Sequence, residues 1–118
     1  MVKMNNYDAI LVCNENYLNP EIRQAIIGKV CLLSEEYKCP VVFPSSIGTK
    51  GVIRRSYPWY VLSGNYYLKY IKEMTDFKSF LLIADPKEIK KHLLDLKNNG
   101  FKAVAYDKLE ELYASKVL

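Results

Sequence analysis

Short apolar runs alternate along the chain with longer stretches in which apolar residues recur every three or four positions. The runs are rich in β-branched and aromatic residues, which favours strands. They are residues 7–13, 39–44, 59–64, 78–85 and 101–107. The longer stretches have the spacing of one helix face. They are residues 19–38, 65–77, 85–100 and 107–118.

This alternation of strand and helix predicts the fold class. Strands that are apolar on both faces are typical of a parallel sheet buried between helices. We therefore predict an α/β protein, a single three-layer domain over residues 1–118, with a mostly parallel sheet of about four or five strands and helices on both faces. The outline is Rossmann-like. Many unrelated proteins share it, so it does not define a function.

Four residues predict where one helix begins and ends and how another packs. Asp85 and Glu88 have the spacing of a capping box and predict a helix that starts directly after the fourth strand. Gly100 is expected to end that helix. Gly28 lies in the middle of the first helix, where we expect it to allow a close approach to the sheet.

Composition limits the class of protein and the candidate chemistry. No apolar run approaches the roughly 20 residues of a membrane helix, and the start lacks a signal-peptide pattern, so we expect a soluble, cytoplasmic protein. Cys13, Cys31 and Cys39 show no CxxC spacing, and His92 is the single histidine. We therefore expect reduced thiols, a surface position for His92 on its helix, and neither a metal nor a cofactor.

Positive charge is concentrated in the middle third of the chain. No acid lies between Glu36 and Glu73. Six of the 17 cations and eight of the 15 aromatic residues, from Tyr37 to Tyr70, fall in this window. Residues 45–70, which we call the basic-aromatic segment, contain four of these cations and six aromatic residues. Such a local excess predicts an anionic partner, nucleic acid or a nucleotide.

Loop lengths predict where that partner binds. In open parallel sheets, ligands bind beyond the carboxyl ends of the strands. The segments after the first and second strands, 14–19 and 44–58, are the longest of these connections. Long connections in compact domains usually carry function. We therefore expect these two segments to form the working face.

The phosphate-binding candidates lie in the second of these segments. Lys50 provides a point charge, and Arg54 and Arg55 provide planar donors that suit phosphate oxygens. Hydroxyl groups that can donate further hydrogen bonds are those of Ser45, Ser46 and Thr49. The sequence lacks the first glycine of an ATPase phosphate loop, so this prediction rests on residue types alone.

Candidate rings for base stacking come directly after these residues in the sequence. Tyr57, Trp59 and Tyr60 could stack on bases, at about 1–3 kcal/mol for each base that does so. The same rings alternate with apolar residues, so burial in the core or in a subunit interface is the competing interpretation. A homodimer that buries this segment is therefore one alternative function.

A small phosphoester hydrolase is the other alternative. It would act on a nucleotide or oligonucleotide, with Glu15 as the candidate catalytic base, because Glu15 is the sole acid in segments 14–19 and 44–58. Cys13 could act as a nucleophile at a strand end, but no histidine is near it in sequence. Asp85 and Asp107 also follow strands, and the predicted helix caps account for both of them.

Overall fold

The computed structural model describes residues 7–13, 20–43, 57, 59–61, 67–85 and 87–106. Its elements, in chain order, are β1 (Ala9–Cys13), α1 (Pro20–Tyr37), β2 (Val41–Phe43), β3 (Trp59–Val61), α2 (Tyr67–Met74), β4 (Ser79–Ala84), α3 (Ile89–Asn98) and β5 (Lys102–Ala105). The predicted helix at 107–118 lies outside the described residues. None of the described helices is long and apolar enough to cross a membrane.

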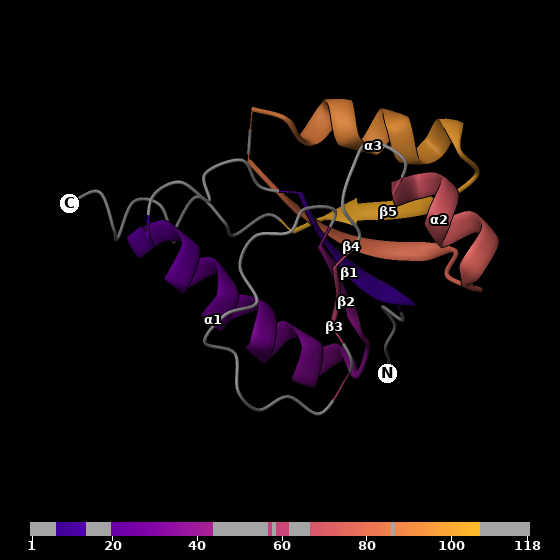
Figure 1. Cartoon of the computed structure of the whole chain (residues 1–118). Coiled ribbons are helices and arrows are strands. Elements are labelled where there is room, and N and C mark those ends of the chain that lie inside the picture. The colour runs from indigo at the N-terminus through magenta and orange to yellow at the C-terminus, as the bar shows by residue number, and fades with distance from the viewer. Residues whose placement is uncertain are drawn as a thin grey trace, which may run out of the picture.

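The five strands form one parallel sheet. Their order is β3-β2-β1-β4-β5, and every neighbouring pair is parallel. The chain starts in the middle of the sheet, runs outward to β3, and returns to the other half with β4 and β5 (Figure 1). The predicted parallel α/β sheet is therefore confirmed. Its order reverses between β1 and β4, which makes the carboxyl ends of these two strands the topological switch point.

Each face of the sheet carries its own apolar core, because successive strand residues point to opposite faces. On one face, Ile10 of β1 packs in a cluster with Ile26 of α1. On the other face, Leu11 packs in a cluster with Ile71 of α2 and Leu96 of α3. Figure 1 shows the same division, with α1 on one side of the sheet and α2 and α3 on the other. Helices cover both faces, as predicted.

The handedness of the crossovers explains this division. A connection between two parallel strands of one sheet is right-handed in nearly all proteins. The crossover through α1 steps from β1 outward to β2, whereas those through α2 and α3 step in the opposite direction, to β4 and then β5. Because all these crossovers are right-handed but run across the sheet in opposite directions, α1 lies on one face of the sheet and α2 and α3 lie on the other.

The end of α1 is closed by a residue in a left-handed conformation. Lys38 follows the helix with a φ of 55°. The Cys39 N–H donates to the Ser34 carbonyl at 3.2 Å, which is the long bond of a Schellman motif. The buried Ser34 hydroxyl donates in turn to the Cys39 carbonyl at 2.7 Å. These bonds turn the chain sharply into β2.

The end of α3 has the same geometry with the expected glycine. Gly100 has a φ of 85°, and the Phe101 N–H donates to the Leu96 carbonyl at 2.9 Å. Phe101 and Leu96 are both buried in the cluster on this face. The prediction that Gly100 ends this helix is therefore confirmed.

The start of α3 differs from the prediction. The helix begins at Ile89, with Glu88 at the cap position and no side-chain hydrogen bond to the cap. The Asp85 carboxylate instead accepts a hydrogen bond from the Lys87 N–H at 3.0 Å, and its carbonyl accepts one from the Glu88 N–H at 2.7 Å. Asp85 thus closes a separate turn before the helix. The predicted direct cap at Asp85 was wrong, because the residues after it form that turn first.

Gly28 also differs from the prediction. It is exposed, and a Cβ built on it meets no atom within 4 Å. The expected close approach to the sheet was therefore wrong. The apolar stripe of α1 that faces the sheet contains Ile26, Val30 and Leu33, and Gly28 lies on the other side of the helix.

Candidate functional site

The switch point lies where β1 and β4 end side by side. Cys13, the last residue of β1, is in register with Ala84, the last residue of β4. Both side chains are buried in the cluster on the α2–α3 face. In open parallel sheets the helices diverge at such a point, and ligands bind in the crevice beyond the carboxyl ends of the strands. The carboxyl ends of β1 and β4 are therefore the expected position of a ligand site.

The two segments expected to form the working face start from neighbouring strands. Segment 14–19 follows Cys13 of β1, and segment 44–58 follows Phe43 of β2. Most of the predicted site residues lie outside the described residues. They are Glu15, Ser45, Ser46, Thr49, Lys50, Arg54 and Arg55. Their roles, including that of Glu15 as a catalytic base, stay predictions.

Strand β3 determines where the other end of segment 44–58 lies. Trp59 is in register with Val41, and Val61 is in register with Phe43. Because the strands are parallel, β3 begins at the edge of the sheet where β2 begins, which we call the amino edge. Phe43 stands at the opposite, carboxyl edge. The described residues on either side of the segment therefore lie at opposite edges of the sheet.

The predicted stacking rings follow this register. Tyr57 is half-buried and precedes the amino end of β3 by two residues. The backbones of Trp59 and Tyr60 belong to β3, whereas their side chains lie outside the described residues. Stacking by these rings stays a prediction. Tyr57 would act at the amino edge and not beside the residues that directly follow Phe43.

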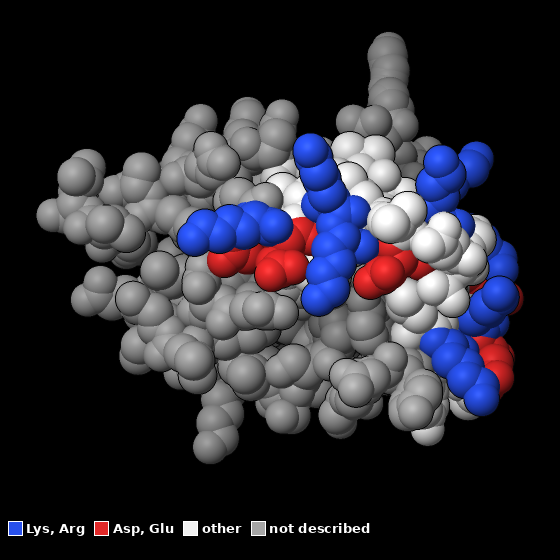
Figure 2. Space-filling view, turned by 90° about the horizontal axis from the view of Figure 1, so that it is seen from above, with Lys and Arg blue, Asp and Glu red and all other residues white. Residues whose placement is uncertain are grey.

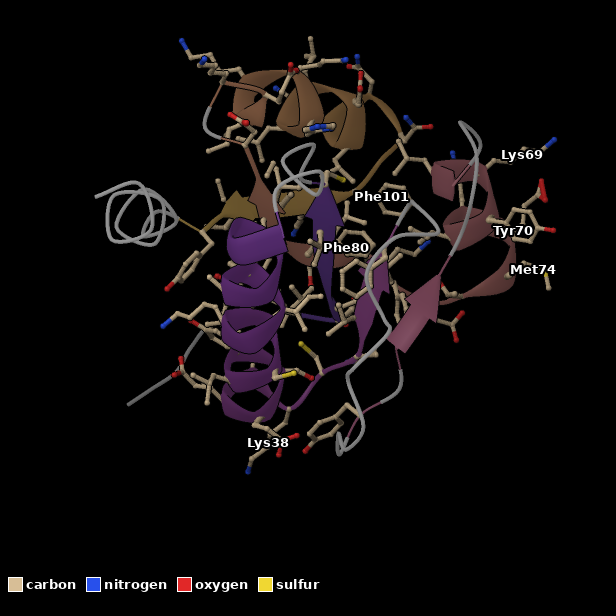
Figure 3. The ribbon with its side chains drawn as sticks, turned by 60° about the vertical axis from the view of Figure 1, so that its left-hand side comes forward. Lys38, Lys69, Tyr70, Met74, Phe80 and Phe101 are labelled. Carbon is tan, nitrogen blue, oxygen red and sulfur yellow. The ribbon has the colours of Figure 1, made fainter. Side chains whose placement is uncertain are left out.

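The described cations of the acid-free window, Lys38, Lys69 and Lys72, do not form one cluster. Lys38 ends α1 just before β2 begins, at the amino edge. Lys69 and Lys72 are exposed on α2. Figure 3 shows Lys38 at the end of α1, well away from Lys69. These charges could therefore contact an extended anion together, but not a single phosphate group.

The sequence assigns no functional role to two titratable groups, Asp85 and His92. Asp85 directly follows β4, is half-buried, and closes its turn through the bond to Lys87. His92, one helical turn into α3, is half-buried, and its Nε2 atom is buried without a hydrogen-bond partner. His92 is thus more buried than the predicted surface position implies. A carboxylate directly after a strand was the sequence signal for Asp85.

No metal cage or nucleophile site emerges from the described residues. Within these ranges, no group of three or more His, Cys, Asp or Glu side chains lies close enough to hold a metal ion. Cys13 is only 8% exposed and packs in the apolar cluster under α2 and α3. A thiol in such surroundings is poorly placed for nucleophilic attack. The described part of the chain thus gives the hydrolase alternative no support.

Lysines also lie over α3, but carboxylates are mixed with them. Figure 2 shows basic and acidic side chains next to one another on this face. The exposed lysines of α3, Lys90, Lys91 and Lys97, share the surface with the exposed Asp95. A mixed surface lacks the field of one sign that attracts a polyanion. We therefore do not include α3 in the candidate site.

Comparison with known proteins adds no further constraint. No family model, curated protein or solved structure matches the chain.

Proposed function

We propose that this protein binds single-stranded nucleic acid through the basic-aromatic segment, without catalysing a reaction. One observation carries the proposal. The parallel pairing of β2 with β3 puts Phe43 and Tyr57 at opposite edges of the sheet, so the acid-free part of the chain that joins them has its ends a full strand length apart.

The residue types of this segment suit a nucleic acid strand. Arg54, Arg55 and Lys50 would neutralise phosphates, which supply most of the affinity of such complexes. Tyr57 and Trp59 would stack on bases, which tolerates any sequence because every base has a flat face. A groove of cations combined with aromatic rings is the usual composition of surfaces that bind single strands.

The separation of Phe43 from Tyr57 favours a nucleic acid strand over a single nucleotide as the ligand. Three residues of a β-strand span about 10 Å. A mononucleotide presents its phosphate charge at one place, whereas a strand repeats it with every residue. Cations spread over such a distance would all be contacted only by a chain of several nucleotides. Lys38 is a described cation of the acid-free window that stands at the amino edge.

Fluorescence anisotropy with labelled oligothymidylates of increasing length tests the proposal. Affinity should rise with length over the range of about 4 to 16 nucleotides, which covers the known site sizes of single-strand binding folds. Thymidine monophosphate should compete poorly. No measurable binding at low salt would overturn the proposal, and so would full competition by the mononucleotide.

A further inference from the structure

Helix α2 presents an apolar stripe to solvent. Tyr70 is 56% exposed and Met74 is 72% exposed. They are four residues apart, so their side chains are neighbours on one face of the helix. Figure 3 shows both of them pointing away from the sheet. Together they form an exposed patch of one ring and one thioether.

The packing of α2 fixes this orientation. Ile71 is completely buried in the cluster on this face of the sheet, and Leu68 packs against it. The helix cannot rotate to bury Tyr70 and Met74 without exposing Ile71. Tyr70 and Met74 therefore stay exposed in the monomer, and only a binding partner can bury them.

The charged residues beside the stripe can pair with the same residues of a second copy of the helix. Lys69 and Glu73 are both exposed and are also four residues apart, so they form a parallel row along the same flank of the stripe. When two identical helices pack antiparallel about a two-fold axis, the same flank of each helix faces the other. Lys69 of one copy would then lie beside Glu73 of the second copy, twice.

We propose that two copies of this chain associate through α2. Tyr70 and Met74 form the apolar centre of the contact, and the two reciprocal pairs of Lys69 with Glu73 set its antiparallel direction. Two of its four residues, Lys69 and Tyr70, belong to the end of the basic-aromatic segment, but none of the residues proposed to hold phosphate or to stack on bases takes part in it. The dimer can therefore fail while strand binding stands, and the reverse is also true.

The size of the contact predicts a weak dimer. Eight helical residues span about 12 Å. A contact of that length buries less than the roughly 1,200–2,000 Å² of a stable interface. We therefore expect an equilibrium between monomer and dimer that depends on protein concentration and weakens with added salt.

Sedimentation velocity over a range of protein concentrations tests this proposal with three variants. Lys69→Glu and Glu73→Lys each turn both attractive pairs into repulsive ones, and each should weaken association by about tenfold. The double variant restores opposite charges across the axis and should regain the association of the original chain. Lys91→Glu is the matched control, because it makes the same charge change on α3 and should have no effect.

Other outcomes would overturn the proposal. An original chain that stays monomeric at millimolar concentration contradicts it. A double variant that associates as weakly as the single variants contradicts the antiparallel pairing. If Tyr70→Ala lowers oligothymidylate affinity while the original chain is monomeric, the stripe belongs to the strand-binding surface and not to a dimer.

Discussion

Trp59 stands in register with Val41, in a parallel pair of strands at one edge of the sheet. This relationship brings the chain back to the amino edge before β3 starts. Phe43, two residues before the basic-aromatic segment, therefore stands at the carboxyl edge, whereas Tyr57 lies two residues before the amino end of β3. This separation of Phe43 from Tyr57 is why we propose a nucleic acid strand and not a single nucleotide as the ligand.

Lys38 and Gly100, the left-handed residues after α1 and α3, should show that glycine is favoured at both positions. Lys38→Gly should raise the free energy of unfolding by about 0.5–1 kcal/mol, because the strain of a left-handed lysine exceeds the entropy that glycine adds to the unfolded chain. Gly100→Ala should lower it by about 1 kcal/mol. A Cβ at Gly100 meets no atom within 4 Å, so this cost is purely conformational. Urea denaturation measures both changes, and the same sign for both would contradict this account.

Gly28 offers a second way to stabilise α1. It is exposed in the middle of the helix and has open space around its Cα. Gly28→Ala should therefore raise the free energy of unfolding by about 1 kcal/mol, the difference in helix propensity between the two residues. Thermal and urea denaturation would measure it. Destabilisation would mean that the glycine packs closely against another part of the chain.

The rings of Phe80 and Phe101 are expected to be coupled. Their centroids are 5.3 Å apart and their planes meet at 79°, an edge-to-face contact between β4 and the end of α3. A double-mutant cycle with Phe80→Leu and Phe101→Leu should give a coupling of about 0.5–1.5 kcal/mol. Leucine preserves much of the buried volume, so the variants should fold.

The opposite face of the sheet supplies the control for this cycle. Ile26 packs in the cluster under α1 and shares no ring contact with Phe101. Ile26→Val combined with Phe101→Leu should therefore be additive within about 0.3–0.5 kcal/mol. A coupling as large as that of the phenylalanine pair would show that the measured effect reflects the whole fold and not the ring contact.

Alkaline pH should destabilise the protein through Cys39. Burial, helped by the negative charge of Asp8, raises the pKa of the Cys39 thiol from 9.0 to about 11. The unfolded chain therefore releases this proton at a lower pH than the folded chain does. Stability should be constant up to about pH 8 and then fall, by at most about 1.4 kcal/mol per pH unit, between pH 9 and 11.

A cysteine variant isolates this effect. Burial also raises the pKa of Tyr7 and of Tyr37 above 10.0, so the tyrosines add to the loss only at higher pH. Between about pH 8.5 and 10, Cys39→Ala should make the free energy of unfolding much less dependent on pH. An unchanged slope in that range would assign the alkaline loss to another group.

The sequence predicts most of this fold because its signals are strong and local. The apolar runs of β1 and β4 and the helical stripe of α1 identify buried elements without any tertiary information. Gly100 marks a helix end because few other residues accept its backbone conformation. These local signals suffice for a parallel α/β sheet.

The features that the sequence did not predict are those that no single local pattern decides. The turn at Asp85 and the later start of α3 result from a choice between two local hydrogen-bond patterns, and the capping-box spacing fits both. The side of α1 occupied by Gly28 follows from how the helix packs. The position of Tyr57 depends on the placement of β3 at the edge beside β2, which no local pattern encodes.

The salt dependence of oligothymidylate binding tests the central claim most directly. Each phosphate contact on a single strand contributes about 0.7 to the slope of log affinity against log salt. Arg54→Ala combined with Arg55→Ala should lower the affinity and make the slope shallower by about 1.4. The control, Lys90→Ala with Lys91→Ala on the mixed surface of α3, removes the same charge and should leave the slope unchanged. Equal slopes for the original chain and the arginine variant would contradict the account.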